Sequence, residues 1–249
     1  MNEKQKEVTL DSFVQLWRAV MAINAKVLGK RVKQTDNLTL LEAKLMDFLV
    51  SLISLNTQAD ETVEFKIADF WGACGMNPTT VLDNDQLVEE ALGRLHSRSG
   101  YIPTRNPESN ESVIKLIGIF RNISFTGADY THCCVRFNPD LFPALSALNT
   151  RFLRATLGAK LSLESMGGWM LFELLCSCKN HQTPMFFKAW TLAKLLNAKR
   201  EYRDGTFQTN VLDPAVDDIN AHSIECKITY VPIAKNDRPS HYEFKWNYL

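Results

Sequence analysis

Four uncharged polar residues open a predicted helix at residues 207–221: Thr206, Gln208, Thr209 and Asn210. Gln and Asn side chains can form two hydrogen bonds with the edge of an adenine, and a Thr methyl can contact the methyl group of thymine. Three aspartates follow on the same helix: Asp213, Asp217 and Asp218. Because these carboxylates would repel phosphates, only the start of the helix is expected to approach a DNA duplex, as a recognition helix does.

Two groups of basic residues flank this predicted helix. Lys199, Arg200 and Arg203 precede it, and Lys235 and Arg238 fall in a predicted loop, residues 234–240, between two later strands. Cations at these places would meet the phosphates beside the groove or reach the minor groove. Thr and Asn are also common at helix starts for capping alone, so a plain solvated helix start is the alternative. The basic groups on both sides favour a DNA-binding surface.

The residues that usually carry catalysis or metals are scattered along the chain. His96, His132, His181, His222 and His241 lie in no motif with a nucleophile or a ligand set, and the chain has no Gly-rich phosphate loop. Six cysteines include the adjacent Cys133 and Cys134 and the pair Cys176 and Cys178, whose spacings differ from those of zinc sites. We therefore predict no enzyme, no cofactor and no metal, with free thiols in a reducing compartment.

The first half of the chain contains helical and strand patterns in alternation. The predicted helices are residues 11–28, a helix that begins at Thr39 with a Thr39–Glu42 capping box, residues 68–74, and residues 85–95. The predicted strands are residues 63–67, 101–104, 112–120, 123–125 and 130–137. The strands at 101–104 and 112–120 are expected to form the hairpin that closes this half.

The second half repeats the same order. Helices are predicted at residues 164–179, 189–196 and 207–221, with a short strand starting at Met185 and a final hairpin of residues 224–231 and 241–246. Each half therefore reads helix, strand, helix, helix, hairpin, which is the order of a winged helix. The prediction is an α+β protein of two tandem winged-helix domains, residues 1–140 and 141–249.

The overall charge is zero, but it is unevenly distributed. Residues 1–140 hold 15 basic and 18 acidic residues, 15 − 18 = −3, and residues 141–249 hold 13 and 10, 13 − 10 = +3. A phosphate-facing surface is thus expected in the second half. The apolar runs are too short or too charged to span a membrane, and residues 1–7 lack the apolar stretch of a signal peptide, so a cytoplasmic location is expected.

Several segments resemble the iteron-binding, theta-type plasmid replication initiators, the Rep family. Residues 211–220, VLDPAVDDIN, resemble that family's V-L-x-P-A-x-x-E-I-N signature, with Asp218 in place of Glu. Residues 171–175, LFELL, resemble its L-Y-E-L-L helix, and residues 192–202 resemble a further segment with Asn197 in place of Gly. Residues 39–53 resemble the opening helix of its first domain.

This resemblance implies two winged-helix domains that bind direct repeats, the iterons, at a plasmid origin. It further implies that residues 1–140 mediate dimerisation with auxiliary DNA contact and that residues 141–249 bind DNA more strongly. A dimer in equilibrium with a monomer, and host replication proteins such as a helicase as partners, are also implied. Relatives often carry Lys or Arg where this chain has Gln208, Thr209 and Asn210, and Arg where it has Met170, so weaker phosphate contact is expected. A winged-helix transcriptional repressor and a protein-interaction adapter that binds no DNA remain alternatives.

Overall fold

The chain folds into two units. The computed structural model describes residues 38–53, 62–76, 85–105, 112–127, 131–141, 145, 154–178, 184–196, 198, 206–223, 226–235 and 238–248. Unit 1 comprises Met1–Gly72 and Met76–Arg154, and unit 2 comprises Ala73–Gly75 and Ala155–Leu249. The predicted helix at residues 11–28 lies outside the described residues, and the predicted boundary between residues 140 and 141 stays a prediction.

Unit 1 contains three described helices, α2 (Leu40–Leu52), α3 (Ile67–Ala73) and α4 (Asp85–Ser97). The capping box predicted at the start of α2 is confirmed: the Glu42 N–H donates to Thr39 Oγ1 at 3.2 Å, and the Thr39 N–H donates to Glu42 Oε2 at 3.1 Å. The Glu42 carboxylate is fully buried and also pairs with Arg94 Nε at 2.6 Å and with an Arg98 guanidinium nitrogen at 2.8 Å. One carboxylate therefore caps α2 and ties it to α4 and the residue that follows it.

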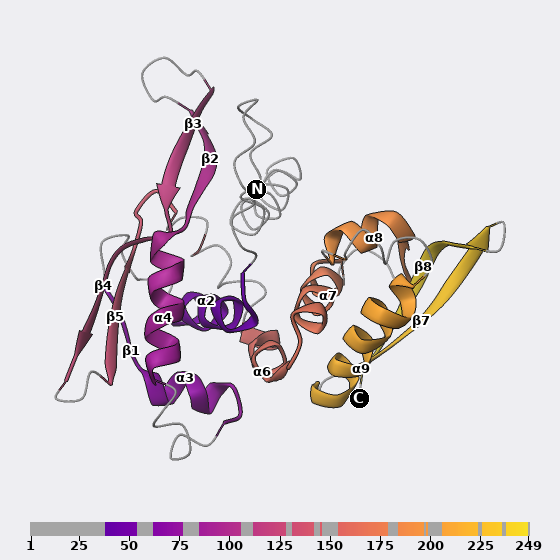
Figure 1. The fold of residues 1–249 in the computed structure, drawn as a ribbon, viewed down its shortest axis with the longest axis horizontal. Coiled ribbons are helices and arrows are strands. Elements are labelled where there is room, and N and C mark those ends of the chain that lie inside the picture. The colour runs from indigo at the N-terminus through magenta and orange to yellow at the C-terminus, as the bar shows by residue number, and fades with distance from the viewer. Residues whose placement is uncertain are drawn as a thin grey trace. The chain divides into compact units, whose positions relative to one another are not determined.

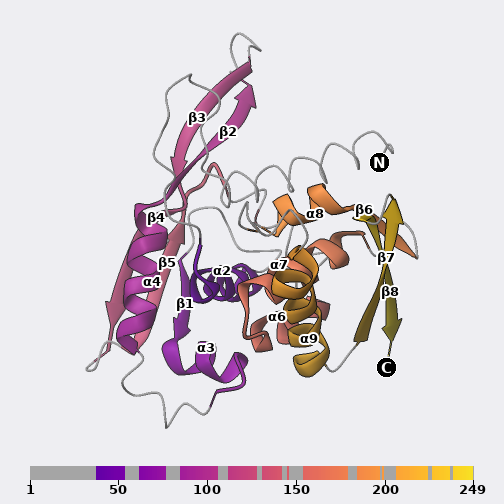
Figure 2. The ribbon, with the colours of Figure 1, turned by 45° about the vertical axis from the view of Figure 1, so that its right-hand side comes forward.

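The strands of unit 1 form two separate sheets. Strands β1 (Val63–Lys66), β4 (Phe120–Thr126) and β5 (His132–Phe137) form a sheet in the order β1-β5-β4, whereas β2 (Ser99–Arg105) pairs only with β3 (Ser112–Gly118). The β2–β3 hairpin extends away from the three helices in both views (Figures 1 and 2).

Unit 2 places helices on one side of a long hairpin (Figure 1). Its helices are α6 (Arg154–Ser162), α7 (Met166–Cys178), α8 (Ala189–Leu195) and α9 (Asp213–His222), with a π-helical turn at Gln208–Leu212 before α9. Strands β6 (Met185–Lys188), β7 (Cys226–Lys235) and β8 (Arg238–Tyr248) form a sheet in the order β6-β8-β7. The core is made of apolar side chains from both layers, among them Trp169, Phe172, Leu212, Ile219 and Phe244.

The two units share one topology. In each, a short strand precedes two helices and then pairs with the last strand of the hairpin, so that β1, β5 and β4 correspond to β6, β8 and β7. This arrangement confirms the predicted α+β architecture of tandem winged helices. It corrects one assignment: the hairpin equivalent to the wing in unit 1 is β4–β5, and β2–β3 is an additional hairpin inserted after α4.

Other elements differ from prediction in detail. Helix α6 was not predicted, because its sequence carries no continuous apolar stripe. The predicted helix at residues 207–221 is divided between the π-helical turn and α9. Strands β7 and β8 extend further than expected, so most of the predicted loop at residues 234–240 is paired strand. Among the helices that the structure describes, none has the length and apolar character needed to cross a membrane.

Candidate DNA interface

The first part of the candidate interface is the turn before α9, residues 206–212, called here the reading turn. The Asn210 N–H donates to the Thr206 carbonyl at 3.0 Å, and the Asp213 N–H donates to the Gln208 carbonyl five residues back. A bond over five residues is the π-helical pattern, which is rare and concentrates at functional sites. Pro214 has no N–H to donate, so the regular helix restarts at Asp213.

The reading turn exposes some of its predicted residues and engages another. Thr206, Thr209 and Asn210 are exposed, and the Thr209 hydroxyl donates to the Thr206 carbonyl at 3.4 Å. Gln208 is half-buried, and its side chain forms a hydrogen bond with the hydroxyl of Tyr230 on β7. Three of the four predicted polar side chains are therefore open to a partner, and the fourth supports the turn.

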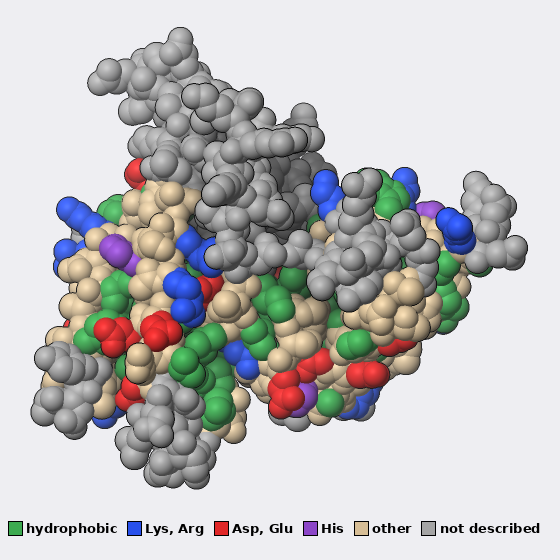
Figure 3. Space-filling model, viewed as in Figure 1, with side chains coloured by type: hydrophobic (Ala, Val, Ile, Leu, Met, Phe, Trp, Pro, Cys, Tyr) green, Lys and Arg blue, Asp and Glu red, His purple; other side chains and the backbone are tan. Residues whose placement is uncertain are grey.

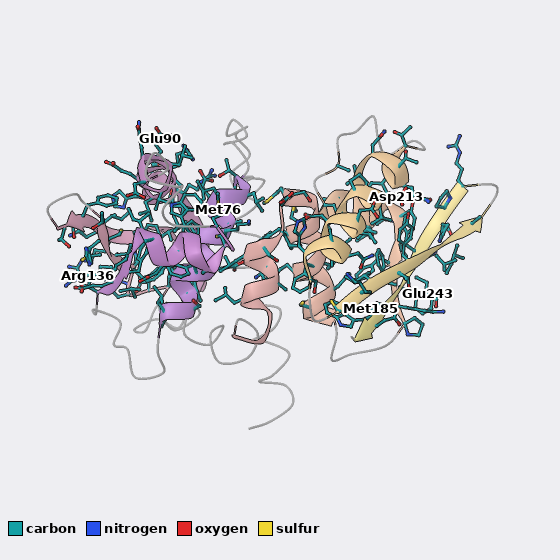
Figure 4. The ribbon with its side chains drawn as sticks, turned by 90° about the horizontal axis from the view of Figure 1, so that it is seen from below. Met76, Glu90, Arg136, Met185, Asp213 and Glu243 are labelled. Carbon is teal, nitrogen blue, oxygen red and sulfur yellow. The ribbon has the colours of Figure 1, made fainter. Side chains whose placement is uncertain are left out.

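Tyr230 connects the reading turn to the wing, which is the β7–β8 hairpin. Its hydroxyl donates to Asp213 Oδ1 at the start of α9. Burial, together with this hydrogen bond to a carboxylate, raises the pKa of Tyr230 above its usual range. Figure 4 shows Asp213 on the side of α9 that faces the strands. The phenol is therefore a neutral donor at physiological pH and fixes the turn against the sheet.

Asp218 joins α9 to the start of α7. Its carboxylate accepts from the Glu164 N–H at 3.0 Å, the Ser165 N–H at 2.8 Å and the Ser165 hydroxyl at 2.6 Å. His222 Nδ1 lies 2.9 Å from Asp218 Oδ1. Because the first N–H groups of a helix lack partners within the helix, this carboxylate satisfies groups that would otherwise be unpaired.

Two further residues hold α9 in place. The Asn220 side-chain amide donates to the Ile228 carbonyl at 2.9 Å, while its oxygen accepts from the Ile228 N–H at 2.7 Å. Ala215 packs against Gly167 of α7, where an added Cβ would lie 3.6 Å from the Ala215 methyl. The segment at residues 211–220 thus attaches α9 to both α7 and β7 and sets the position of the reading turn.

The wing contributes the second part of the candidate interface. Lys235 and Arg238 are directly opposite one another at the ends of β7 and β8, and the Arg238 side chain is exposed. The prediction that both lie in an unpaired loop was wrong, since the ladder continues to these two residues. Lys199, Arg200 and Arg203 lie outside the described residues, so their place beside the reading turn stays a prediction.

Residues that support the interface were missed by sequence reasoning. The aspartates at 213 and 218 were interpreted as carboxylates that repel phosphate, and Tyr230 was assigned no role. Asp213 and Asp218 instead accept hydrogen bonds from β7 and from the start of α7. The one sequence signal for these contacts was the family signature at residues 211–220. It fixes a carboxylate at Asp218 and an amide at Asn220, which suggests that each side chain has a specific partner.

The described part of the chain offers no group of three or more His, Cys, Asp or Glu side chains able to hold a metal ion. The five cysteines that the structure describes form no disulfide, and Cys133, Cys176 and Cys226 are buried. Burial, followed by the neighbouring Cys134, raises the pKa of Cys133 to about 12. A thiol held protonated in this way is a poor nucleophile.

Two winged-helix units with an exposed polar turn beside a wing define the class of nucleic-acid-binding initiator and regulator domains. The chain belongs to the initiator replication protein family: residues 30–176 match the model "Initiator Replication protein, WH1", and residues 190–246 match "Initiator Rep protein, WH2". The first match ends at residue 176 and so includes all but the last two residues of α7, which packs against α9. No curated protein matches the chain significantly.

Solved structures share the fold at low sequence identity. The Pi initiator protein in complex with iteron DNA is 17% identical, with a TM-score of 0.63 over 85% of this chain and 91% of that chain. Domains 2 and 3 of RctB are 12% identical, with a TM-score of 0.58 over 85% of this chain and 83% of that chain. Both similarities extend over most of the chain and support the tandem fold.

Proposed function

We propose that this protein starts plasmid replication by binding direct repeats in double-stranded DNA at the origin, and that unit 2 reads the repeat. The observation that carries the proposal is the reading turn: Thr206, Thr209 and Asn210 are exposed on a turn held rigidly by Asp213, Asp218 and Asn220. Side chains that recognise base edges bind more tightly when they are already fixed in place, because an ordered turn loses little conformational entropy on binding.

The charges around the turn support a duplex as the partner. Arg238 is exposed at the end of the wing, and Lys235 stands opposite it in the ladder. Together with Lys199, Arg200 and Arg203 they are the proposed phosphate contacts, which position a protein without specifying sequence. The proposed base contacts are Thr206, Gln208, Thr209 and Asn210, with Gln208 the least available because of its bond to Tyr230.

Membership of the initiator family and the iteron complex of the similarly folded Pi protein support direct repeats as the target. The proposal includes a homodimer in equilibrium with the monomer, recruitment of host replication proteins such as a helicase, and action in the cytoplasm, where plasmids reside. The protein is proposed to act by binding alone, without catalysis.

The experiment that tests this function is selection of bound duplexes from a random-sequence pool at about physiological salt, where specific and non-specific binding separate. We expect one enriched motif, present as direct repeats beside the gene. A palindromic motif would indicate a repressor instead. No enrichment with a folded protein would reject DNA reading and favour a protein-interaction adapter.

A further inference from the structure

The reading turn differs from a regular helix in which of its side chains are buried. The segment that follows it has an apolar stripe of four buried side chains: Leu212, Ala215, Val216 and Ile219. In a continuous α-helix this stripe would extend back to residues 209 and 208, three and four positions before Leu212. The structure instead buries Phe207, which is 5% exposed, and leaves Thr209 exposed.

The π-helical hydrogen bond accounts for this shift. The Asp213 N–H donates to the Gln208 carbonyl five residues back, so the turn holds one residue more than a turn of α-helix. A residue five positions before Leu212 would point away from the core of an α-helix, but the extra residue brings Phe207 into the stripe and takes Thr209 out of it. The register of the turn therefore decides which side chains are exposed.

Two aromatic contacts hold the turn in this register. The Phe207 ring meets the Tyr242 ring of β8 edge to face, with 5.9 Å between the ring centroids, and Tyr242 is 2% exposed. The Tyr242 ring also meets that of Tyr230 on β7, at 5.7 Å, and the Tyr230 hydroxyl donates to Asp213 at the far end of the turn. Both ends of the reading turn are thus attached to tyrosines on adjacent strands.

Pro214 disfavours the regular alternative. In a continuous α-helix its ring would clash with the carbonyl of Asn210, four positions back, and it has no N–H to donate to that carbonyl. In the structure Pro214 lies in the first positions of α9, which tolerate proline. Pro214 therefore opposes the shorter turn, and Phe207 anchors the longer one.

We propose that the extra residue of the reading turn sets the DNA sequence that unit 2 prefers, with Phe207 as the positioning residue that holds the register. Closing the turn by one residue would shift Thr209 and Asn210 by about 1.5 Å along the helix axis and about 100° around it. Hydrogen bonds to base edges do not survive such a displacement. Figure 3 shows acidic side chains along α9, where Asp217 is exposed, so the uncharged turn is the part that can approach DNA. This inference rests on the proposed function, because a register can set a sequence preference only in a protein that reads DNA.

The first test removes the extra residue and keeps the side chains proposed to read bases. With Val211 deleted and Pro214→Ala, the turn can close into a continuous α-helix that still buries Phe207, now four positions before Leu212. Pro214→Ala alone keeps the register and is the matched control. Fluorescence anisotropy gives the ratio of affinities for the selected and random duplexes. We expect this ratio to be at least about 10-fold lower in the deletion variant than in the control, the equivalent of one good base contact, while the midpoint of urea unfolding is no lower.

The second test concerns Phe207 itself. Phe207→Ser removes the apolar anchor, whereas Phe207→Leu keeps one of similar size. We expect the affinity ratio to fall in the serine variant and to be largely retained in the leucine variant. Phe172→Leu, at a fully buried aromatic residue of α7, is the control for lost stability and should leave the ratio unchanged. All variants are compared at a temperature where urea unfolding shows them to be folded.

The outcomes separate this inference from the proposed function. A folded deletion variant with the affinity ratio of its control would overturn the inference and leave the proposed function intact. If the deletion variant does not fold, the second test decides, and a ratio that falls no further in Phe207→Ser than in Phe172→Leu would overturn the inference. An unchanged chain that does not prefer any duplex would reject the proposed function and this inference together.

Discussion

At the residue scale, the signature at residues 211–220 can be explained position by position. Leu212 and Ile219 enter the core, Pro214 ends the π-helical turn, and Ala215 allows α7 to come close. The two polar members, Asp218 and Asn220, bind backbone groups of other elements. These residues make contacts within unit 2, so the signature reports how the reading turn is held, and the proposed choice of DNA sequence lies with residues before it.

Two adjacent glycines on α7 offer a matched test of the Asp218 contact. A Cβ at Gly168 would lie 2.2 Å from Asp218 Oδ2 and 3.0 Å from the Ser165 hydroxyl oxygen, whereas a Cβ at Gly167 meets only ordinary contact. Gly168→Ala should displace the carboxylate from its three donors and lower the free energy of unfolding by about 2 kcal/mol. Gly167→Ala should leave it unchanged or raise it by up to about 1 kcal/mol. Urea unfolding of both variants measures the difference, and equal losses would show that the Asp218 contact is unimportant.

Base reading and phosphate binding should respond differently to single substitutions. Asn210→Ala removes an exposed amide from the reading turn and should weaken binding to the selected motif by about 1–3 kcal/mol, with little effect on random duplexes. Arg238→Ala should weaken binding to all duplexes alike. It should also make the slope of log affinity against log salt shallower by roughly 0.9, the contribution of one phosphate contact. Titration of both variants against selected and random duplexes measures this. Equal losses on every sequence for both variants would mean that the reading turn is wrongly assigned.

At the element scale, the wing and the reading turn act as one body through Tyr230. Its hydroxyl is the donor to Asp213 and the acceptor for Gln208, which are five residues apart at the two ends of the π-helical segment. The pKa of Tyr242, next to Tyr230 in the sheet, is also raised, first by burial and then by the charge of Asp213. A turn with rare geometry is therefore supported by half-buried polar contacts with the adjacent strand.

Tyr230→Phe should loosen this support and leave the core filled. The loss of one hydroxyl should lower the free energy of unfolding by about 1 kcal/mol. Because the turn is no longer fixed and Gln208 is released, we expect the ratio of affinities for selected and random duplexes to fall several-fold. The affinity for random duplexes should change much less. Thr229→Ala, an exposed neighbour on the same strand, is the control. Discrimination that stays at the level of the unchanged chain would show that Tyr230 serves stability alone.

The elements that could be predicted from the sequence are those defined by local patterns. The Thr39–Glu42 capping box needs only two residues three positions apart, and it forms as expected. The wing of unit 1 was misassigned because β1 pairs with β5, about 70 residues later, and no local pattern reveals such a pairing. The exposure of Thr209 and Asn210 followed from the helical stripe, but the Gln208–Tyr230 bond depends on the hairpin folding back onto the turn.

At the scale of the whole molecule, neither unit carries much net charge: unit 1 holds 17 basic and 18 acidic residues, 17 − 18 = −1, and unit 2 holds 11 and 10, 11 − 10 = +1. DNA binding therefore depends on where the exposed cations lie. Two cations that are half-buried or buried serve the fold: Arg98 pairs with Glu42, and Lys160 pairs with Glu173 and lies over the Trp169 ring at 5.1 Å from its centroid. The exposed side of α4 carries Glu89, Glu90 and Arg94, and the Glu90 carboxylate lies 3.7 Å from the Arg94 guanidinium. The phosphate contacts proposed above are a small number of cations in unit 2.

This small number predicts a modest salt dependence. The proposed phosphate contacts are five: Lys199, Arg200, Arg203, Lys235 and Arg238. Since each neutralised phosphate contributes roughly −0.9 to the slope of log affinity against log salt, the slope should be no steeper than roughly −4.5. Titrations of a single-site duplex from low to physiological salt measure it. A much steeper slope would place additional cations on the DNA, most directly those of unit 1, and would contradict a duplex contact confined to unit 2.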